Sequence, residues 1–328
     1  MLQPNVDEHI LADTNDDDSL LDAESLLDSN LSLYSSVRDY SYENGRRYHA
    51  YRHGQYPMPN DEEEQERLEL MHHLFKLLLG GESYRAPIHQ PQRILDVGTG
   101  TGTWAMEMAD EFPDAQIQGT DLSPIQPTWA PPNCSFVVDD AESDWAYTKE
   151  EAFDYIHARS MGGGIGDWER LLRQAYEHVK PGGWVEIQEY DAWVYSDDGT
   201  DQEAVMVQSF QHKLEEASTQ FGKRMNVAPQ LKGWMQKAGF VNVADDIYKC
   251  PIGPWPKAPR LKEIGKIGKL AYLEAVEPYT LALFTRVLGY TYDEALEFVQ
   301  KVLAELRSST YHVYVLFHYV YGQRPFDG

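Results

Sequence analysis

Two periods of hydrophobic and polar positions alternate along the middle of this 328-residue chain. Five short runs rich in β-branched and aromatic residues predict strands at Arg93–Val97, Gln116–Thr120, Ser135–Val138, Phe153–Ala158 and Trp184–Tyr190. Helical patterns separate these runs, and the clearest extends from Asp167 to about Val179. Strands that alternate with helices predict an α/β fold, in which a parallel sheet carries helices on both faces.

The flanks of this region follow a different pattern. Before it, Asp61 precedes three glutamates and an apolar stripe, which predicts a helix that ends at Gly80-Gly81. After it, we expect helices at Gln202–Phe221 and Ala228–Ala238, a strand near Val241–Lys249, helix throughout 260–308 and a strand over 311–321. Because this last segment is apolar on both alternating faces, it predicts a late strand inserted into the sheet.

These patterns divide the chain into five segments. We expect an acidic arm over 1–37, an N-terminal lid and helix over 38–90, a cofactor-binding core over 91–250, a helical insertion over 251–310 and a final core strand over 311–328. Much of the aromatic content lies in the lid and in the insertion. We therefore expect both to cover an aromatic acceptor pocket.

The charge of the chain narrows the class of partner. It has 28 lysines and arginines against 53 aspartates and glutamates, which gives a formal charge of −25. Such a surface repels a phosphate backbone, so we expect a small-molecule acceptor and no nucleic acid. The 1–37 arm contains nine acidic residues and no lysine or arginine, and any protein partner is expected to dock there.

Cysteine content and hydropathy bear on the compartment. Cys134 and Cys250 supply no disulfide framework, which favours a reducing environment. We see neither a signal peptide nor an apolar run that could span a bilayer, so we expect a cytoplasmic protein without membrane contact. The neighbouring His72 and His73 lack the spacing of a metal site, and no metal is expected.

Candidate chemistry begins at the turn after the first predicted strand, Asp96-Val97-Gly98-Thr99-Gly100-Thr101-Gly102. Its three glycines let the backbone turn sharply and let a ligand lie against the start of the next helix. A dinucleotide-binding turn would need glycine or alanine at the following position, which is Thr103. The spacing therefore favours S-adenosylmethionine over NAD, with Asp96 placed to orient the turn and approach the methionine amino group.

Polar residues also follow the next three predicted strands. Asp121 ends the second strand, where a carboxylate can accept hydrogen bonds from both ribose hydroxyls. Asp140 follows the third strand and can accept from an adenine amino group, whereas Asp139 is equally well read as a helix cap. His157 ends the fourth strand. The predicted cofactor-binding set is Tyr48, Asp96, Gly98, Thr99, Gly100, Gly102, Asp121, Leu122, Asp140, Ala141 and His157.

The segments that carry these residues resemble the fungal LaeA-like methyltransferases. The similarity covers roughly residues 40 to 200 and runs through Tyr48–Tyr56, Pro59–Glu62, Ile94–Trp104, Asp121–Pro127, Pro131–Asn133, Asp139–Glu142, Trp145, Phe153–Arg159, Asp167–Trp168 and Lys180–Glu189. It implies a Rossmann-like class I methyltransferase fold, with S-adenosylmethionine as cofactor and S-adenosylhomocysteine as product. The resemblance implies the same placement of the cofactor, with the glycines at the methionine end, Asp121 on ribose and Asp140 with Ala141 at adenine.

The resemblance leaves the acceptor open. Some members are similar to nuclear regulators of fungal secondary metabolism that act with velvet-type partners, and others to enzymes that methylate one metabolite. The acidic start has no basic cluster suited to nuclear import, so we favour methylation of a small secondary metabolite. The alternatives are a nuclear regulator or scaffold that acts on protein partners, and a fold repurposed for ring chemistry that does not consume the cofactor.

Methyl transfer requires an acceptor held near the methyl group, exclusion of water and, for many acceptors, removal of a proton. His157 is the first candidate for the general base, because it lies at the sheet edge where ligands bind. A buried histidine with a structural role would give the same pattern. Glu189, Tyr190 and His212 are the further candidates.

Overall fold

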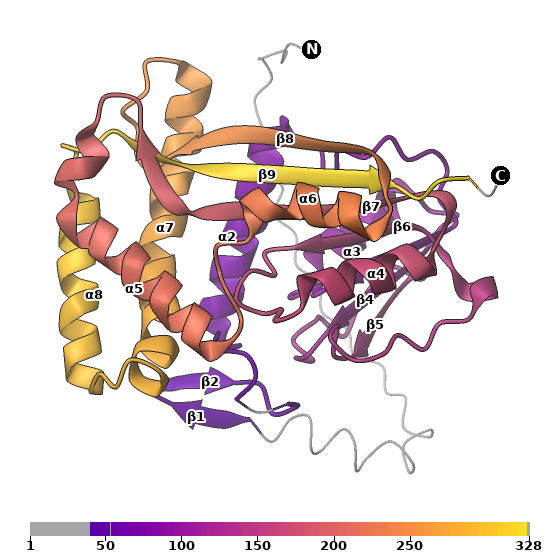
Figure 1. The fold of residues 1–328 in the computed structure, drawn as a ribbon, viewed down its shortest axis with the longest axis horizontal. Coiled ribbons are helices and arrows are strands. Elements are labelled where there is room, and N and C mark those ends of the chain that lie inside the picture. The colour runs from indigo at the N-terminus through magenta and orange to yellow at the C-terminus, as the bar shows by residue number, and fades with distance from the viewer. Residues whose placement is uncertain (1–39, 53, 327–328) are drawn as a thin grey trace, which may run out of the picture.

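A central sheet organises the computed structural model, which describes residues 40–52 and 54–326. Within these residues seven strands form one sheet in the order β5-β4-β3-β6-β7-β9-β8. They are β3 (Arg93–Val97), β4 (Gln116–Asp121), β5 (Cys134–Val138), β6 (Phe153–Arg159), β7 (Val179–Ser196), β8 (Val241–Pro251) and β9 (Val313–Gln323). β3 to β7 are parallel, and β9 lies antiparallel between β7 and β8 (Figure 1). The predicted α/β sheet and its inserted last strand are confirmed, whereas the predicted 1–37 arm lies outside the described residues.

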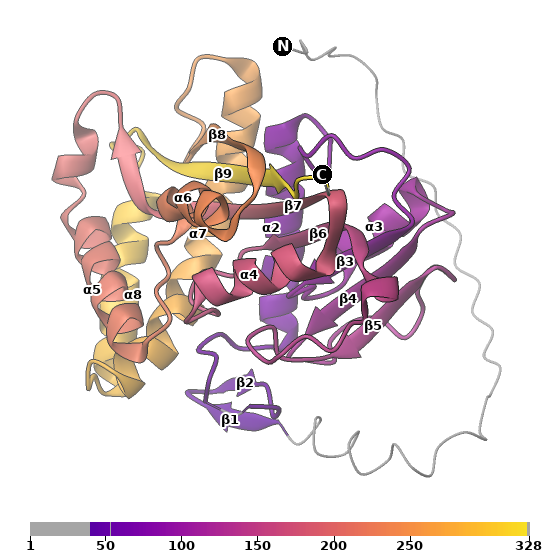
Figure 2. The same ribbon diagram turned by 45° about the vertical axis from the view of Figure 1, so that its right-hand side comes forward.

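Helices cover both faces of the sheet because strand residues point alternately to either side. On one face, Ile94 and Tyr155 share a core with α3 (Thr103–Glu111), and α2 (Glu62–Leu79) extends this layer. On the other face, Leu95 and Ile156 share a core with α4 (Trp168–His178) and α6 (Ala228–Ala238). Figure 2 shows α4 and α6 in front of the sheet, with α2 and α3 behind it.

A third apolar core lies toward the ends of β7, β8 and β9 that are far from the glycine-rich part of the sheet. It is formed by α5 (Val205–Phe221), α7 (Pro259–Arg286) and α8 (Tyr292–Arg307), at the left of Figure 1. The prediction of helix throughout 260–308 is wrong at 287–291, where Gly289 adopts a φ of 73° and Thr291 caps α8. Two 3-10 turns, Lys149–Glu151 and Thr200–Glu203, complete the helical elements of the described chain.

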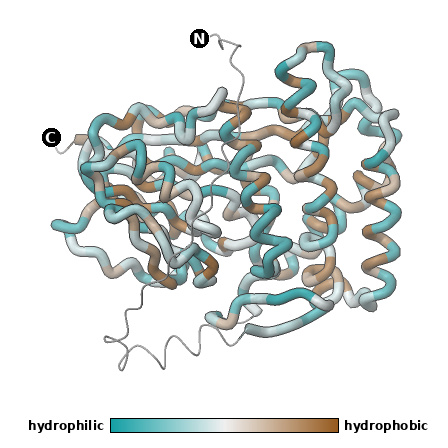
Figure 3. Tube along the Cα trace, turned by 180° about the vertical axis from the view of Figure 1, so that it is seen from behind, coloured by the Kyte–Doolittle hydropathy of each residue, from teal (hydrophilic) through white to brown (hydrophobic). Residues whose placement is uncertain are grey.

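The N-terminal segment attaches to this helical core. A hairpin of β1 (Ser41–Glu43) and β2 (Arg46–Tyr48) lies below α7 in Figure 1, and Glu43 forms an ion pair with Arg286 at the end of that helix. Hydrophilic and hydrophobic positions alternate along the helices in Figure 3, as the burial of one face requires. None of the helices in the described part of the chain combines the length and apolar composition of a bilayer span.

β7 is longer than the predicted strand Trp184–Tyr190, and two irregularities interrupt its pairing with the neighbouring strands. The first contains Lys180–Gly183, and Gly182 has a φ of 81° there. The second lies between Tyr190 and Val194. Bulges move side chains out of the regular alternation of a strand. The second bulge lies in the wall of a cavity that forms part of the candidate active site.

Candidate active site

The glycine turn follows β3 at the carboxyl edge of the sheet. Gly98 and Gly100 have φ values of 68° and 57°, a left-handed conformation that favours glycine. A Cβ atom at position 98 would lie 2.1 Å from the sulfur of Met161. Glycine is therefore required at 98 both by the backbone conformation and by the space available.

Asp96 supports this turn from inside the sheet. Its carboxylate accepts a hydrogen bond from Thr99 Oγ1 at 2.6 Å and contacts His157 Nδ1 at 2.8 Å. Because Asp96 and His157 are directly paired on β3 and β6, their side chains point to the same face. The His157 ring is fully buried and stacks on Trp104 of α3, with 3.7 Å between ring centroids. Asp96 and His157 thus hold the turn in place.

Asp121 lies at the end of β4, opposite the glycine turn. Its two carboxylate oxygens accept hydrogen bonds from the backbone N–H groups of Gly100 at 2.8 Å and Ser123 at 2.9 Å. Burial raises the pKa of Asp121 to about 6, although these backbone hydrogen bonds act in the opposite direction. At pH 7 the carboxylate is mostly ionised and can accept further hydrogen bonds from a ligand.

A cleft of about 900 Å³ opens along this edge, and we call it the sheet-edge cleft. Its sheet side contains Gly98, Gly100, Asp121, Leu122, Asp139, Asp140 and Ala141. Tyr56 and Asn60 line its other side, and Asn60 Nδ2 donates to Ser123 Oγ at 3.2 Å. Arg52 forms an ion pair with Asp140, with 3.3 Å between Nε and Oδ2. The N-terminal segment therefore covers the cleft.

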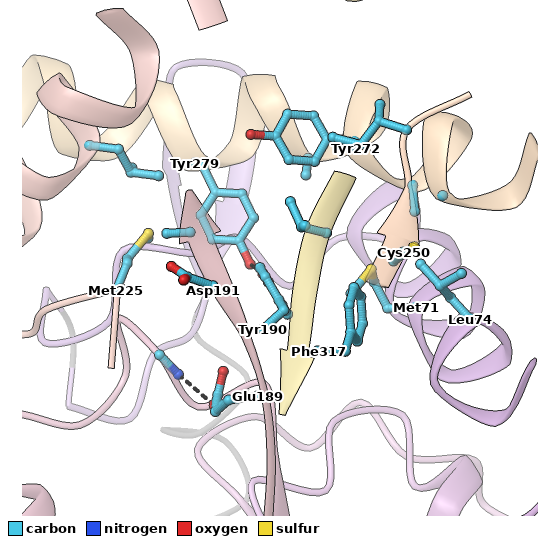
Figure 4. Close-up of a pocket in the computed structure, with 18 of the residues that line it drawn as sticks. Met71, Leu74, Glu189, Tyr190, Asp191, Met225, Cys250, Tyr272, Tyr279 and Phe317 are labelled. Atoms are coloured by element: carbon cyan, nitrogen blue, oxygen red, sulfur yellow. Dashed lines mark hydrogen bonds between the residues drawn. The ribbon is translucent and has the colours of Figure 1, made fainter. Parts of the chain in front are cut away.

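A second pocket lies between α2, α5, α7, β7, β8 and β9, and we call it the apolar cavity (Figure 4). Most of its walls are buried apolar side chains, among them Met71, Leu74, Phe210, Leu214, Met225, Ile252, Ala271 and Phe317. Its charged or acidic side chains are Arg67, Glu189 and Asp191. Such a lining suits a small organic molecule with few polar groups.

The sheet-edge cleft and the apolar cavity adjoin at one peptide. Met161 lines the cleft, and Gly162 lines the cavity. Both residues donate a backbone N–H to Glu189 Oε1, Gly162 over 2.9 Å. Glu189 is buried, and burial raises its pKa to about 8. A carboxyl group that exchanges its proton near neutral pH therefore lies where the two spaces meet.

Comparison with known proteins decides the family. The family model described as "Methyltransferase domain" matches residues 64–245. This chain belongs to that family. It is 45% identical over 297 residues to the methyltransferase pytC of Aspergillus terreus, which covers 90% of this chain and 91% of the relative. It is 35% identical over 290 residues to the secondary metabolism regulator LAE1 of Cochliobolus heterostrophus, with coverages of 86% and 94%.

Solved methyltransferase structures are among the proteins to which this chain is similar. The phosphoethanolamine N-methyltransferase 2 of Haemonchus contortus in complex with S-adenosyl-L-methionine is 20% identical, with a TM-score of 0.43 and coverages of 79% of this chain and 52% of that one. The chain is an S-adenosylmethionine-dependent methyltransferase with the class I Rossmann-like fold. The predicted family, fold and cofactor are thereby confirmed.

Several residues of the predicted cofactor set do not line the methyltransferase's sheet-edge cleft. Tyr48 is buried under Arg286, whose guanidinium carbon lies 4.9 Å from the ring centroid, and Tyr56 lines the cleft instead. Gly102 is the residue before α3, and a Cβ there would lie 2.5 Å from the Phe136 ring. The turn therefore uses Gly102 for packing.

The structure places the four candidate bases in different surroundings. His157 points toward α3 and does not line the apolar cavity, because its strand pairing directs it with Asp96. His212 is exposed on α5, beside the ring of Trp193. Glu189 and Tyr190 do line the apolar cavity. Of the four candidates, Glu189 alone lies at the junction with the sheet-edge cleft.

The structure adds three residues that our candidate set lacks. Arg159 lines the sheet-edge cleft, and its Nη2 is 2.8 Å from His72 Nδ1. The sequence could have indicated Arg159, because it lies two residues after His157 at the end of the same strand. Arg67 and Tyr279 line the apolar cavity from α2 and α7. No sequence motif marks these two, because each occurs within an ordinary amphipathic helix.

Proposed function

We propose that this methyltransferase methylates a small, largely apolar molecule held in the apolar cavity. The observation that carries the proposal is the junction at Met161-Gly162, where a buried apolar space adjoins the sheet-edge cleft. A protein side chain would need an open channel to reach this point, whereas the lining side chains are mostly buried. A small organic acceptor fits such a space better.

The sheet-edge cleft has the groups that S-adenosylmethionine needs. The Asp121 carboxylate would accept hydrogen bonds from the ribose hydroxyls, and Asp140 with Ala141 would meet the adenine. Gly98 and Gly100 leave space for the methionine end beside their backbone. Arg159 would attract the methionine carboxylate with its guanidinium charge. The ion pair of Arg52 with Asp140 would hold the N-terminal segment over the bound cofactor.

Glu189 is our candidate proton acceptor. When bound, S-adenosylmethionine supplies an electrophilic methyl group attached to a sulfonium. Two backbone N–H groups fix one oxygen of Glu189, and the other oxygen points into the apolar cavity in Figure 4. There it can take the proton that an acceptor hydroxyl loses as its oxygen becomes methylated. The apolar walls exclude water from this exchange.

A protein acceptor is the second candidate function. The observation that favours it is the 35% identity to LAE1, which is a regulator of secondary metabolism. In that case the full chain would transfer methyl groups to protein, and the acidic 1–37 arm would be needed to recognise the partner. The apolar cavity would then have no acceptor to hold.

One labelling experiment separates the two functions. The full chain is incubated with methyl-labelled S-adenosylmethionine and either a small-molecule extract or a protein extract of a filamentous fungus. We expect label in a small organic product, and none with the variant Asp121→Asn, which should lose cofactor affinity. Label that enters protein only, and that requires the 1–37 arm, would refute the proposed function.

A further inference from the structure

The apolar cavity has a pair of hydrogen-bonded tyrosines in its wall. Tyr279 projects from α7 toward Tyr190 on β7, and their hydroxyl groups are hydrogen-bonded to each other (Figure 4). Burial raises the pKa of both groups, so both remain protonated. Two hydroxyl protons are thus present, but only one can lie between the two oxygens. The second proton remains available to a ligand.

Arg67 supplies further unused donors to the same cavity. Its Nε and Nη2 atoms donate to both carboxylate oxygens of Glu64, at 2.8 and 2.6 Å. Both side chains are buried, so this pair neutralises two charges that would be costly alone. In the described part of the chain Nη1 of Arg67 makes no hydrogen bond. Arg67 lines the cavity with its guanidinium carbon 5.4 Å from the Tyr279 ring centroid, so the N–H groups of Nη1 can donate to a ligand beside the tyrosine pair.

Most hydrogen-bond acceptors in this cavity are already engaged. Glu189 Oε1 accepts two backbone N–H groups. The two oxygens of Asp191 accept from the backbone N–H of Trp193 at 3.2 Å and from the hydroxyl of Tyr195. Glu189 Oε2 accepts no side-chain hydrogen bond among the lining residues described. The cavity thus offers free donors on the tyrosine pair and on Arg67, and an acceptor on Glu189.

From this arrangement of donors and acceptor we infer that the methyl acceptor is an apolar ring compound with two oxygens, a carbonyl or enolate oxygen bound by Arg67 and the tyrosine pair, and a hydroxyl directed to Glu189. An unpaired buried donor is costly, so a ligand gains affinity when its own oxygens satisfy these groups. A protonated amine has no acceptor for these groups and would leave the donors unpaired. The inference rests on the proposed function, because it specifies the molecule held in the apolar cavity.

Binding of four naphthalene probes tests the inference without any methyl transfer. They are 2-acetyl-1-naphthol, 2-acetylnaphthalene, 2-ethylnaphthalene and 1-(aminomethyl)naphthalene, which differ in oxygen content and charge on one scaffold. Dissociation constants are measured by equilibrium dialysis with the full chain saturated with S-adenosylhomocysteine. We expect the two acetyl compounds to bind roughly tenfold more tightly than 2-ethylnaphthalene, and the amine to bind no more tightly than 2-ethylnaphthalene.

Two sets of variants identify the groups responsible. Tyr190→Phe or Tyr279→Phe alone removes one proton but also ends the mutual hydrogen bond, so one free donor remains and affinity for the acetyl compounds should fall about threefold at most. The double variant removes the last hydroxyl donor and should lower it roughly tenfold, with no effect on 2-ethylnaphthalene. Tyr292→Phe, an exposed tyrosine at the start of α8, is the matched control. Arg67 is left in place because its loss would strand the buried charge of Glu64.

Three results would overturn the inference. These are tighter binding of the amine than of the acetyl compounds, no binding of either acetyl compound, and a double variant that binds them as well as the wild type does. Methyl transfer is measured separately with labelled cofactor and fungal extract. Retained probe selectivity without transfer to any small molecule would refute the proposed function alone, and transfer without probe selectivity would refute this inference alone.

Discussion

Replacement of Glu189 by glutamine should stabilise the fold while it removes activity. The buried carboxyl has a pKa of about 8, against 4.5 for an ordinary glutamate. Between these two values the unfolded chain releases a proton that the folded chain keeps. The free energy of unfolding of the wild type therefore falls as pH rises from 4.5 to 8. Glutamine does not titrate, and its side-chain oxygen can still accept from Gly162 and Met161.

The size of this effect follows from the two pKa values. Each pKa unit corresponds to about 1.4 kcal/mol, so the penalty in the wild type is about 1 kcal/mol at pH 5 and on the order of 3 kcal/mol at pH 7. The advantage of Glu189→Gln over the wild type should thus grow by roughly 2 kcal/mol between these pH values. Its methyl transfer should fall about 100-fold or more, since general bases contribute factors of that size.

Urea unfolding at pH 5 and pH 7 measures the change in stability. The amount of labelled small-molecule product, compared with that formed by the wild type, measures the change in methyl transfer. Glu203→Gln, at an exposed position, is the matched control and should change neither. Wild-type turnover should rise with pH toward an apparent pKa near 8, because the ionised carboxylate is the proposed base. A variant with full turnover, or a stability difference that is the same at both pH values, would refute this account of Glu189.

Two further predictions concern the sheet-edge cleft. Asp121→Asn should weaken S-adenosylhomocysteine binding about 10- to 100-fold in calorimetry at pH 7.5. The affinity of the wild type should decline as pH falls through about 6, whereas that of the variant should not. Equal affinities at pH 7.5 would contradict the proposed role of Asp121 in binding the ribose. Gly98→Ala places a Cβ 2.1 Å from the Met161 sulfur at a position with positive φ. It should abolish detectable cofactor binding and lower the melting temperature. Gly45→Ala is the control, because Gly45 also has a positive φ but open space around it, and it should leave cofactor binding intact.

The sheet-edge cleft was largely predictable because its residues lie close together in the sequence. Gly98 and Gly100 lie within one turn, and the parallel sheet brings Asp121 to the same edge. The errors came from side-chain direction. Tyr48 faces Arg286 because of the way the β1–β2 hairpin packs on α7. The sequence of the hairpin alone does not predict that it packs on α7.

His157 shows why a position at the sheet edge is not enough to identify a base. It occupies the carboxyl end of β6, as predicted, but direct pairing with Asp96 turns its ring toward α3. The register between two strands sets which residues share a face, and a single sequence does not reveal the register. His157 is expected to act on the turn through Asp96.

The apolar cavity could not be derived from alternation along β7. In a regular strand successive side chains point to opposite faces, so Glu189 and Tyr190 should serve different surfaces. Instead Glu189, Tyr190, Asp191 and Ala192 all line one cavity, because the register shifts between Tyr190 and Val194 and the chain there passes along the cavity wall. The opposing walls come from α2, α5 and α7, whose apolar stripes resemble those of any packed helix. The glycine turn of the sheet-edge cleft is thus a contiguous motif, whereas the proposed acceptor site is built from a bulge and from helices far apart in the sequence. We therefore expect substitutions at the bulge to change which acceptor is methylated while cofactor affinity is kept.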